Sequence, residues 1–91
     1  MFAFGKAVEL LKEGDRVYRQ GWNGKGMFLF LVKGEAVTEA IEDHYGDPEA
    51  KGVHKVHDAI YMHTAQGDLV PWLASQTDVL AEDWIYIVDN K

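Results

Sequence analysis

The chain of 91 residues contains no cysteine, only two prolines and no long apolar run. The absence of cysteine excludes a disulfide-stapled scaffold, a thiol nucleophile and a zinc ribbon. The longest apolar run, residues 27–32, is far shorter than the roughly 20 residues that a membrane-spanning helix needs. The first residues also lack the basic start and apolar middle of a secretory signal. We therefore expect one soluble domain, residues 1–91, in the cytoplasm.

Basic residues are scarce as well. Nine Lys and Arg stand against 15 Asp and Glu, which gives a formal net charge of −6. This balance argues against binding to DNA or RNA polymers, because phosphate contacts need a basic surface. The charge is uneven, however, since six of the nine basic side chains lie in residues 1–33. A small anionic ligand would meet a locally positive first third, although ordinary solvated surface charge is the alternative explanation.

The apolar pattern predicts an α+β fold. Apolar side chains at positions 4, 7, 8 and 11 recur with the period of a helix, and Gly14 follows at the expected left-handed helix end. Strands are predicted where β-branched and aromatic residues concentrate, at 16–20, 27–32, 59–64, 69–70 and 83–88. Ser75 is a suitable N-cap for a brief helical turn. We expect an N-terminal helix packed on an antiparallel β-sheet, with one further short helix near the C-terminus.

Residues 33–58 are the most difficult to interpret. Val37, Ala40 and Ile41 permit a short helix, which Gly46-Asp47-Pro48 would break. No internal repeat or low-complexity tract is visible in this stretch or elsewhere.

Two predicted strands, 27–32 and 83–88, are apolar on both faces. The N-terminal helix can cover one face of the sheet, and few residues remain to cover the other. A second copy of the chain is the simplest cover, so we expect a homo-oligomer.

Catalytic candidates are confined to histidines and nearby acids. The set that a metal or hydrolytic site would need comprises His44, His54, His57, His63, Asp43, Asp47 and Asp58. Its spacing matches no zinc-protease or EF-hand pattern, and no Gly-x-Ser-x-Gly elbow is present. Surface histidines in an acidic segment are the preferred interpretation, so we expect no catalytic residue, no metal and no cofactor.

Two tracts have a composition that suits binding. Residues 21–26 place Trp22 among glycines, and residues 71–78 place Trp72 just before a polar helix start. An indole in a loop offers a flat face that stacks on bases or sugars. The structural alternatives are a plain hairpin loop, and Trp72 in the core with Ser75 as an ordinary cap. Trp84 opens an apolar strand and is predicted to be core.

Together the two tracts resemble the second Thoeris anti-defence family of phages. The resemblance rests on Gly-Trp-Asn-Gly-Lys-Gly-Met at 21–27, Pro-Trp-Leu-Ala-Ser-Gln-Thr-Asp at 71–78, and the opening segment 4–14. That family is described as a sponge, which sequesters a cyclic ADP-ribose isomer without degrading it. Some of its members also hold cyclic di- or trinucleotides. The resemblance implies a helix on an antiparallel sheet, assembled as a homotetramer with ligand pockets between subunits, in the host bacterial cytoplasm.

The resemblance also implies a ligand-binding set drawn from both tracts. Its members are Trp22, Asn23, Trp72, Ser75, Gln76, Thr77 and Asp78. Positive charge for a diphosphate would come from Arg16, Arg19 and Lys25. Asp78 suits ribose hydroxyls unless it only completes the helix cap. Two rival functions remain open, a small hydrolase of the signal and a structural or adaptor subunit of a phage particle.

Overall fold

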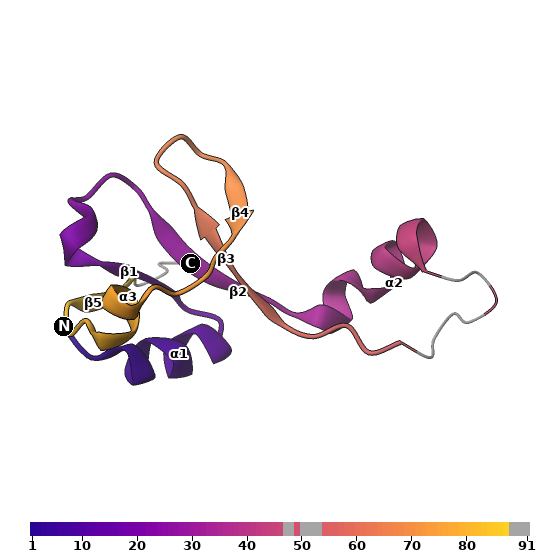
Figure 1. The fold of residues 1–91 in the computed structure, drawn as a ribbon, viewed down its shortest axis with the longest axis horizontal. Helices are drawn as coiled ribbons and strands as arrows, with labels where there is room; N and C mark the ends of the chain where they lie inside the picture. The colour runs from indigo at the N-terminus through magenta and orange to yellow at the C-terminus, as the bar shows by residue number, and fades with distance from the viewer. Residues whose placement is uncertain (47–48, 50–53, 88–91) are drawn as a thin grey trace.

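The computed structural model describes residues 1–46, 49 and 54–87 (Figure 1). Its elements follow the order α1 (Phe4–Lys12), β1 (Arg16–Arg19), the 3-10 turn η1 (Gln20–Trp22), β2 (Phe28–Val32), α2 (Gly34–Tyr45), β3 (Ala59–His63), β4 (Leu69–Pro71), α3 (Gln76–Leu80) and β5 (Trp84–Ile87). The predicted α+β fold is confirmed, including the short helix near the C-terminus. Asp47, Pro48 and Val88, which entered the predicted break and the last predicted strand, lie outside the described residues.

The five strands form one antiparallel sheet in the order β4-β3-β2-β1-β5. The last strand therefore pairs with the first, and Phe2 forms a further bridge to Trp84 beside it. Pro71 is the final residue of β4 itself, whereas the sequence predicted a strand that stops before it. β4 lies at an edge of the sheet, where the missing proline N–H costs no ladder bond.

Helix α1 covers one side of this sheet, over β1, β2 and β5. It ends as predicted at Gly14, whose φ of 95° is left-handed. The Gly14 N–H donates to the Leu11 carbonyl and the Asp15 N–H to the Leu10 carbonyl, both at 3.0 Å, which is the Schellman arrangement. Its apolar face packs into a core of fully or nearly fully buried side chains, namely Ala7, Leu10, Leu11, Val17, Leu29 and Trp84.

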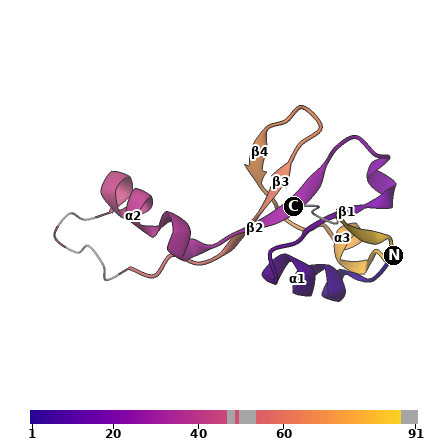
Figure 2. The ribbon, with the colours of Figure 1, turned by 180° about the vertical axis from the view of Figure 1, so that it is seen from behind.

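Helix α2 lies apart from the sheet, on an arm formed by residues 33–46 and 54–58 (Figures 1 and 2). Its 12 residues exceed the short helix that the sequence permitted. The Gly34 N–H donates to Asp58 Oδ1 at 2.8 Å, and a Cβ on Gly34 would overlap the Val56 carbonyl. The returning chain thus fixes the start of α2. None of the helices within the described ranges is long and apolar enough to cross a membrane.

The side of the sheet opposite α1 is called the open face here. Side chains alternate along a strand, so the neighbours of buried Val17 and Leu29 point to this side. The open face carries Arg16, Tyr18, Phe28, Phe30, Tyr61, His63, Ile85 and Ile87. All eight are intermediate in burial, in contrast to the fully buried residues beneath α1. Within the described part of the chain, one side of the sheet is covered and the other is not.

Candidate ligand-binding site

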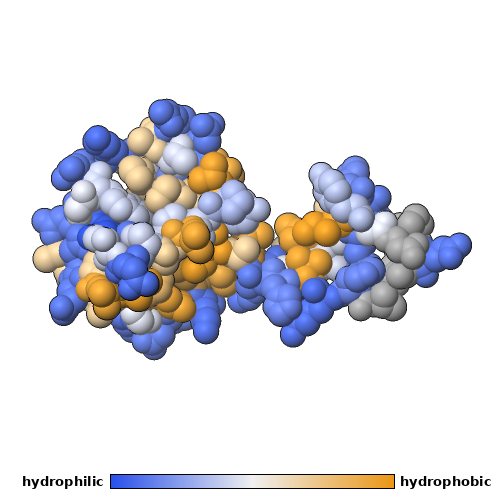
Figure 3. All heavy atoms as spheres, in the orientation of Figure 1, coloured by the Kyte–Doolittle hydropathy of each residue, from blue (hydrophilic) through white to orange (hydrophobic). Residues whose placement is uncertain are grey.

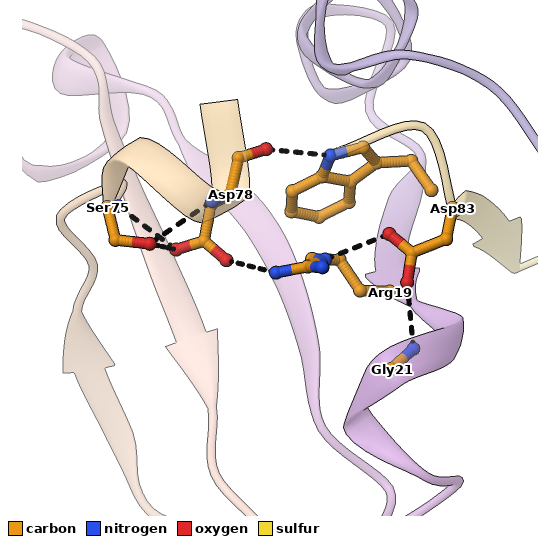
Figure 4. A network of polar contacts seen from close by, with 6 residues as sticks. Arg19, Gly21, Ser75, Asp78 and Asp83 are labelled. Carbon is orange, nitrogen blue, oxygen red and sulfur yellow. Dashed lines mark hydrogen bonds and ion pairs between the residues drawn. The ribbon is translucent and has the colours of Figure 1, made fainter. Parts of the chain in front are cut away.

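Arg19 joins the two tracts that the sequence singled out (Figure 4). Its Nε donates to Asp83 Oδ1 and its terminal nitrogen to Asp78 Oδ1, both at 2.9 Å. The other Asp83 oxygen accepts the Gly21 N–H at 2.9 Å. One guanidinium therefore connects the start of the first tract, the end of the second and the residue before β5.

Ser75 and Asp78 form a capping box at the start of α3. The Asp78 N–H donates to Ser75 Oγ at 3.1 Å, while Asp78 Oδ2 accepts the Ser75 N–H at 3.0 Å and the Ser75 hydroxyl at 2.8 Å. The predicted cap is confirmed. Both Asp78 oxygens already accept hydrogen bonds, one from Ser75 and the other from Arg19.

These contacts displace the pKa values of the three charged groups. Partial burial is the largest single influence on Asp78 and opposes its ionisation, but the bonds from Ser75 and Arg19 together outweigh it and lower its pKa below the ordinary 3.8. The Arg19 hydrogen bond, aided by the Gly21 N–H, lowers the pKa of Asp83 against some desolvation. The same bond from Asp83 raises the pKa of Arg19. All three groups are therefore charged at neutral pH.

All three tryptophans meet in one cluster. Trp84 is fully buried, as predicted, and its indole N–H donates to the Asp78 carbonyl at 3.2 Å. Trp22 and Trp72 each approach it edge-on, with ring centroids 5.5 and 6.1 Å away. Both are partly buried and pack against the core, yet each keeps an accessible surface. The two outer indoles thus combine a packing role with a solvent-accessible surface.

A cavity of about 380 Å³ opens beside the first tract. It is lined by Tyr18, Trp22, Gly24, Lys25, Gly26, Met27, Phe28 and Ile87. Its walls include three aromatic rings, the aliphatic side chains of Met27 and Ile87, and one ammonium group, and no carboxylate is among the described residues that line it. Its volume falls within the range of small-molecule pockets. Aromatic faces beside a cation suit a planar base attached to a phosphate.

Phe28 in the cavity wall is held by its neighbours on both adjacent strands. The Arg16 guanidinium lies 5.1 Å from the Phe28 ring centroid. The His63 ring stacks on Phe28 with centroids 4.6 Å apart and planes 8° from parallel. Because β1 and β3 lie on opposite sides of β2, the Phe28 ring is held from both sides, by Arg16 and by His63.

Trp72 lines a different opening, a groove of about 490 Å³ between α1 and β3–β4. The described residues of its wall are Val8, Leu11, Lys12, Leu31, Asp58, Ala59, Ile60, Pro71 and Trp72. Within one chain, therefore, the two tryptophans of the predicted site each contact Trp84 but line two separate openings.

The remaining predicted residues lie around these openings. Asn23 is exposed, with a left-handed φ of 58°, in the loop that leads to Gly24. Ser75, Gln76 and Thr77 are exposed at the start of α3. Sequence reasoning missed Tyr18, Phe28 and Ile87 as cavity walls. The sequence feature that could have indicated them is that the strands are apolar on both faces. This pattern predicts that both faces are covered, but it does not predict which residues or molecules each face contacts.

The histidines and acids of the alternative metal site are dispersed. His63 lies on the sheet and bonds the Gly26 carbonyl at 3.2 Å, while His54 lies 3.5 Å from Glu42 on the arm. Asp58 accepts the Gly34 N–H, and Asp47 lies outside the described residues. Over the ranges that the structure describes, no three His, Asp or Glu side chains are placed to hold a metal ion.

Two comparisons relate this chain to known proteins. A family profile described as "Thoeris anti-defense 2-like domain" matches residues 2–87. The protein named Thoeris anti-defense 2 from Bacillus phage SP01 is 45% identical over 82 residues, which cover 90% of this chain and 90% of that protein.

Proposed function

The chain belongs to the Thoeris anti-defense 2-like family, and from that membership we propose that it counters bacterial Thoeris immunity on behalf of a phage. It does so by binding a cyclic ADP-ribose-type signal and holding it intact. This is the activity of a sponge, which needs tight binding and no chemical step. The site is the cavity beside Trp22, extended by the exposed start of α3.

The cavity is the observation that carries this proposal. Trp22, Tyr18 and Phe28 supply aromatic surface, and Lys25 supplies positive charge at the same opening. A nucleobase gains about 1–3 kcal/mol from stacking on one aromatic side chain. A diphosphate gains charge-assisted hydrogen bonds from an ammonium group. The same cavity also suits the base of a cyclic di- or trinucleotide.

The second tract completes the site in an assembly. Ser75, Gln76 and Thr77 are exposed, and their hydroxyl and amide groups recognise ribose and base edges. Asp78 and Arg19 already bond one another, so their first role is to hold α3 against the loop of the first tract. We propose a homotetramer in which ligand pockets form between subunits, so that α3 of one copy borders the cavity of another.

One experiment separates the sponge from its rivals. The protein is mixed with the cyclic ADP-ribose isomer, removed by filtration and then heated to release whatever it holds. A sponge depletes the filtrate, and the heated fraction returns intact ligand. A hydrolase yields products instead, and a phage structural subunit leaves the filtrate unchanged; either result would refute the proposal. Repeating the assay with a cyclic dinucleotide defines the range of ligands.

Trp22 provides the residue-level test. We expect Trp22→Ala to weaken ligand binding ten- to a hundredfold, the size of one base–aromatic contact, with the oligomer intact. Trp84→Ala is the contrasting variant, because truncating a fully buried tryptophan costs about 3–5 kcal/mol of stability. Ligand titration and thermal melting are measured on both. Normal binding by Trp22→Ala, or unfolding as severe as that of Trp84→Ala, would rule out its role at the ligand.

Trp72→Ala decides how the second tract contributes. Trp72 contacts Trp84 in the same edge-on way as Trp22 but does not line the cavity. A loss of affinity with unchanged melting would place the Trp72 indole at a ligand held between subunits. A loss of stability alone would assign it to the core.

A further inference from the structure

Helix α2 buries a charged side chain and exposes apolar ones, the reverse of a helix that packs on a core. The buried residues of the helix are Gly34 and Glu42, so a carboxylate is buried. Val37, Ile41 and Tyr45 recur at intervals of four and form an apolar stripe on the helix surface. Ile41 is 39% exposed and Tyr45 is 86% exposed. A helix that served only its own chain would bury the apolar stripe instead.

The stripe cannot reach the core of its own chain. Only Lys33 separates β2 from α2, and Gly34 is fixed against Val56 and Asp58. Helix α2 consequently points away from the body, which is the five-stranded sheet with helices α1 and α3 (Figures 1 and 2). The radius of gyration is 15.3 Å, whereas a compact chain of this length would have about 12 Å.

The body has an apolar groove that could receive an apolar stripe of this kind. The groove between α1 and β3–β4 is walled by Leu11, Leu31, Ile60 and Trp72, and its lining also includes Lys12 and Asp58. Figure 3 shows apolar side chains gathered separately on the body and on the arm, on the same face of the molecule. Insertion of an amphipathic helix into such a groove, with anchors one turn apart, is a common recognition mode.

The exposed area favours a second copy of this chain as the occupant. The charged side chains do not decide it, because the groove lining contains one lysine and one carboxylate, Lys12 and Asp58. The chain exposes 6530 Å², roughly 1,100 Å² more than a compact monomer of its mass. A standard interface buries about 800 Å² of each partner, so the excess surface is sufficient for one.

We propose that the stripe Val37, Ile41 and Tyr45 of α2 docks in the groove between α1 and β3–β4 of a second copy. Around a twofold axis each copy gives its arm and receives the partner's, so the contact is made twice. The inference rests on the self-association proposed above, and it puts Trp72, which lines the groove, at this contact between copies rather than at the ligand.

The absence of cysteine allows a direct test by crosslinking. Ile41→Cys and Lys12→Cys chains with different tags are co-expressed and oxidised, so that a disulfide reports Cα atoms within about 7 Å. We expect the mixed crosslinked pair to form at least tenfold faster than a crosslink within either variant alone. Phe30→Cys, on the open face, is the competing position. Preferential pairing of Ile41→Cys with Phe30→Cys, or no preference, would overturn the inference.

A charge substitution provides an independent readout. The double variant Ile41→Asp, Tyr45→Asp should lower the mass seen by light scattering at least twofold at micromolar concentration. Tyr86→Asp is the matched control, because Tyr86 is 46% exposed, lies on β5 at the opposite edge of the sheet and is in neither the arm nor the groove wall. Retention of mass by the double variant, or equal dissociation of the control, would contradict arm docking. A monomeric wild-type chain would overturn the self-association proposal as well, whereas an oligomer with the wrong crosslink would overturn only this inference.

Discussion

At the scale of single residues, Arg19 organises the polar part of the molecule. Its side chain is largely shielded from solvent and bonds Asp78 and Asp83 at the same time. A planar guanidinium can serve two carboxylates in fixed directions, which a lysine ammonium does not do. Asp83 in turn holds the Gly21 N–H, so the arginine positions the loop that leads to Trp22. The order of the cavity wall therefore depends on an ion-pair network outside the cavity.

This network predicts a specific loss of stability in acid. The pKa values of Asp78 and Asp83 are lower in the folded protein than their ordinary 3.8. Groups of this kind stabilise the fold fully above the unfolded pKa, and that stability is lost as the pH falls through the folded pKa. We expect the melting temperature to be steady from pH 7 to about pH 5 and to fall below about pH 4.

Substitution of the arginine tests the cause of that loss. Arg19→Gln should have a lower melting temperature than the wild type at pH 7. Its melting temperature should also fall less between pH 5 and pH 3, because the guanidinium no longer stabilises the charged forms of Asp78 and Asp83. Lys6→Gln makes the same change of charge at an exposed position of α1. If both variants show the same acid dependence, the ion pairs are not its source.

At the scale of elements, the strands were predictable, and the arm was predictable only as a short helix, without the length of α2 or its position away from the sheet. The predicted strand at 27–32 is β2, Phe28–Val32, because the pattern of a strand is local to its own residues. Helix α2 has a less visible pattern, since its contact with residues 54–58 uses Gly34 and Glu42 while Ile41 stays exposed. Hydrophobic periodicity detects helices that pack on a core. For α2, which packs on a returning chain, the spacing of Val37, Ala40 and Ile41 permits a short helix but does not show where the helix packs.

The candidate site was predictable to a similar extent. Trp22 and Lys25 do line one cavity, and Ser75 does cap α3. The walls contributed by Tyr18 and Ile87 depend on the pairing of β1 with β5, at Tyr18↔Ile85 and Arg16↔Ile87. That register joins residues about 70 positions apart in the sequence, and no local pattern specifies it.

Gly34 is the element-level determinant of the arm. A Cβ there would overlap the Val56 carbonyl, which is backbone and cannot move aside as a flexible side chain would. We expect Gly34→Ala to detach the start of α2 from the returning chain and to expose the arm to proteases, while the body melts near the wild-type temperature. Limited proteolysis with mass spectrometry locates the cuts.

Ala36→Gly is the matched control, because Ala36 is exposed and its change affects only the helix. It should weaken α2 by about 1 kcal/mol without displacing the arm. Equal resistance of Gly34→Ala and the wild type to proteolysis would show that the close approach does not hold the arm.

At the scale of the whole molecule, two surfaces remain without a cover in the described chain. One is the open face, with its partly buried Phe28, Phe30 and Ile85, and the other is the apolar stripe of α2. The sequence predicted the first from strands that are apolar on both sides. A tetramer with twofold axes has two different isologous interfaces, so it can cover both surfaces. A dimer with one interface leaves one of them in water.

Dilution measures this directly. When folding and assembly are linked, the melting temperature depends on protein concentration. For a tetramer each tenfold dilution removes about 1 kcal/mol per chain, which corresponds to roughly 4–8 °C for a chain of this size. Light scattering should give a mass near four times 10.3 kDa at micromolar concentration. A melting temperature that is unchanged over a hundredfold dilution, together with the mass of one chain, would mean that both surfaces are stable in water, and a ligand pocket between subunits would then be impossible.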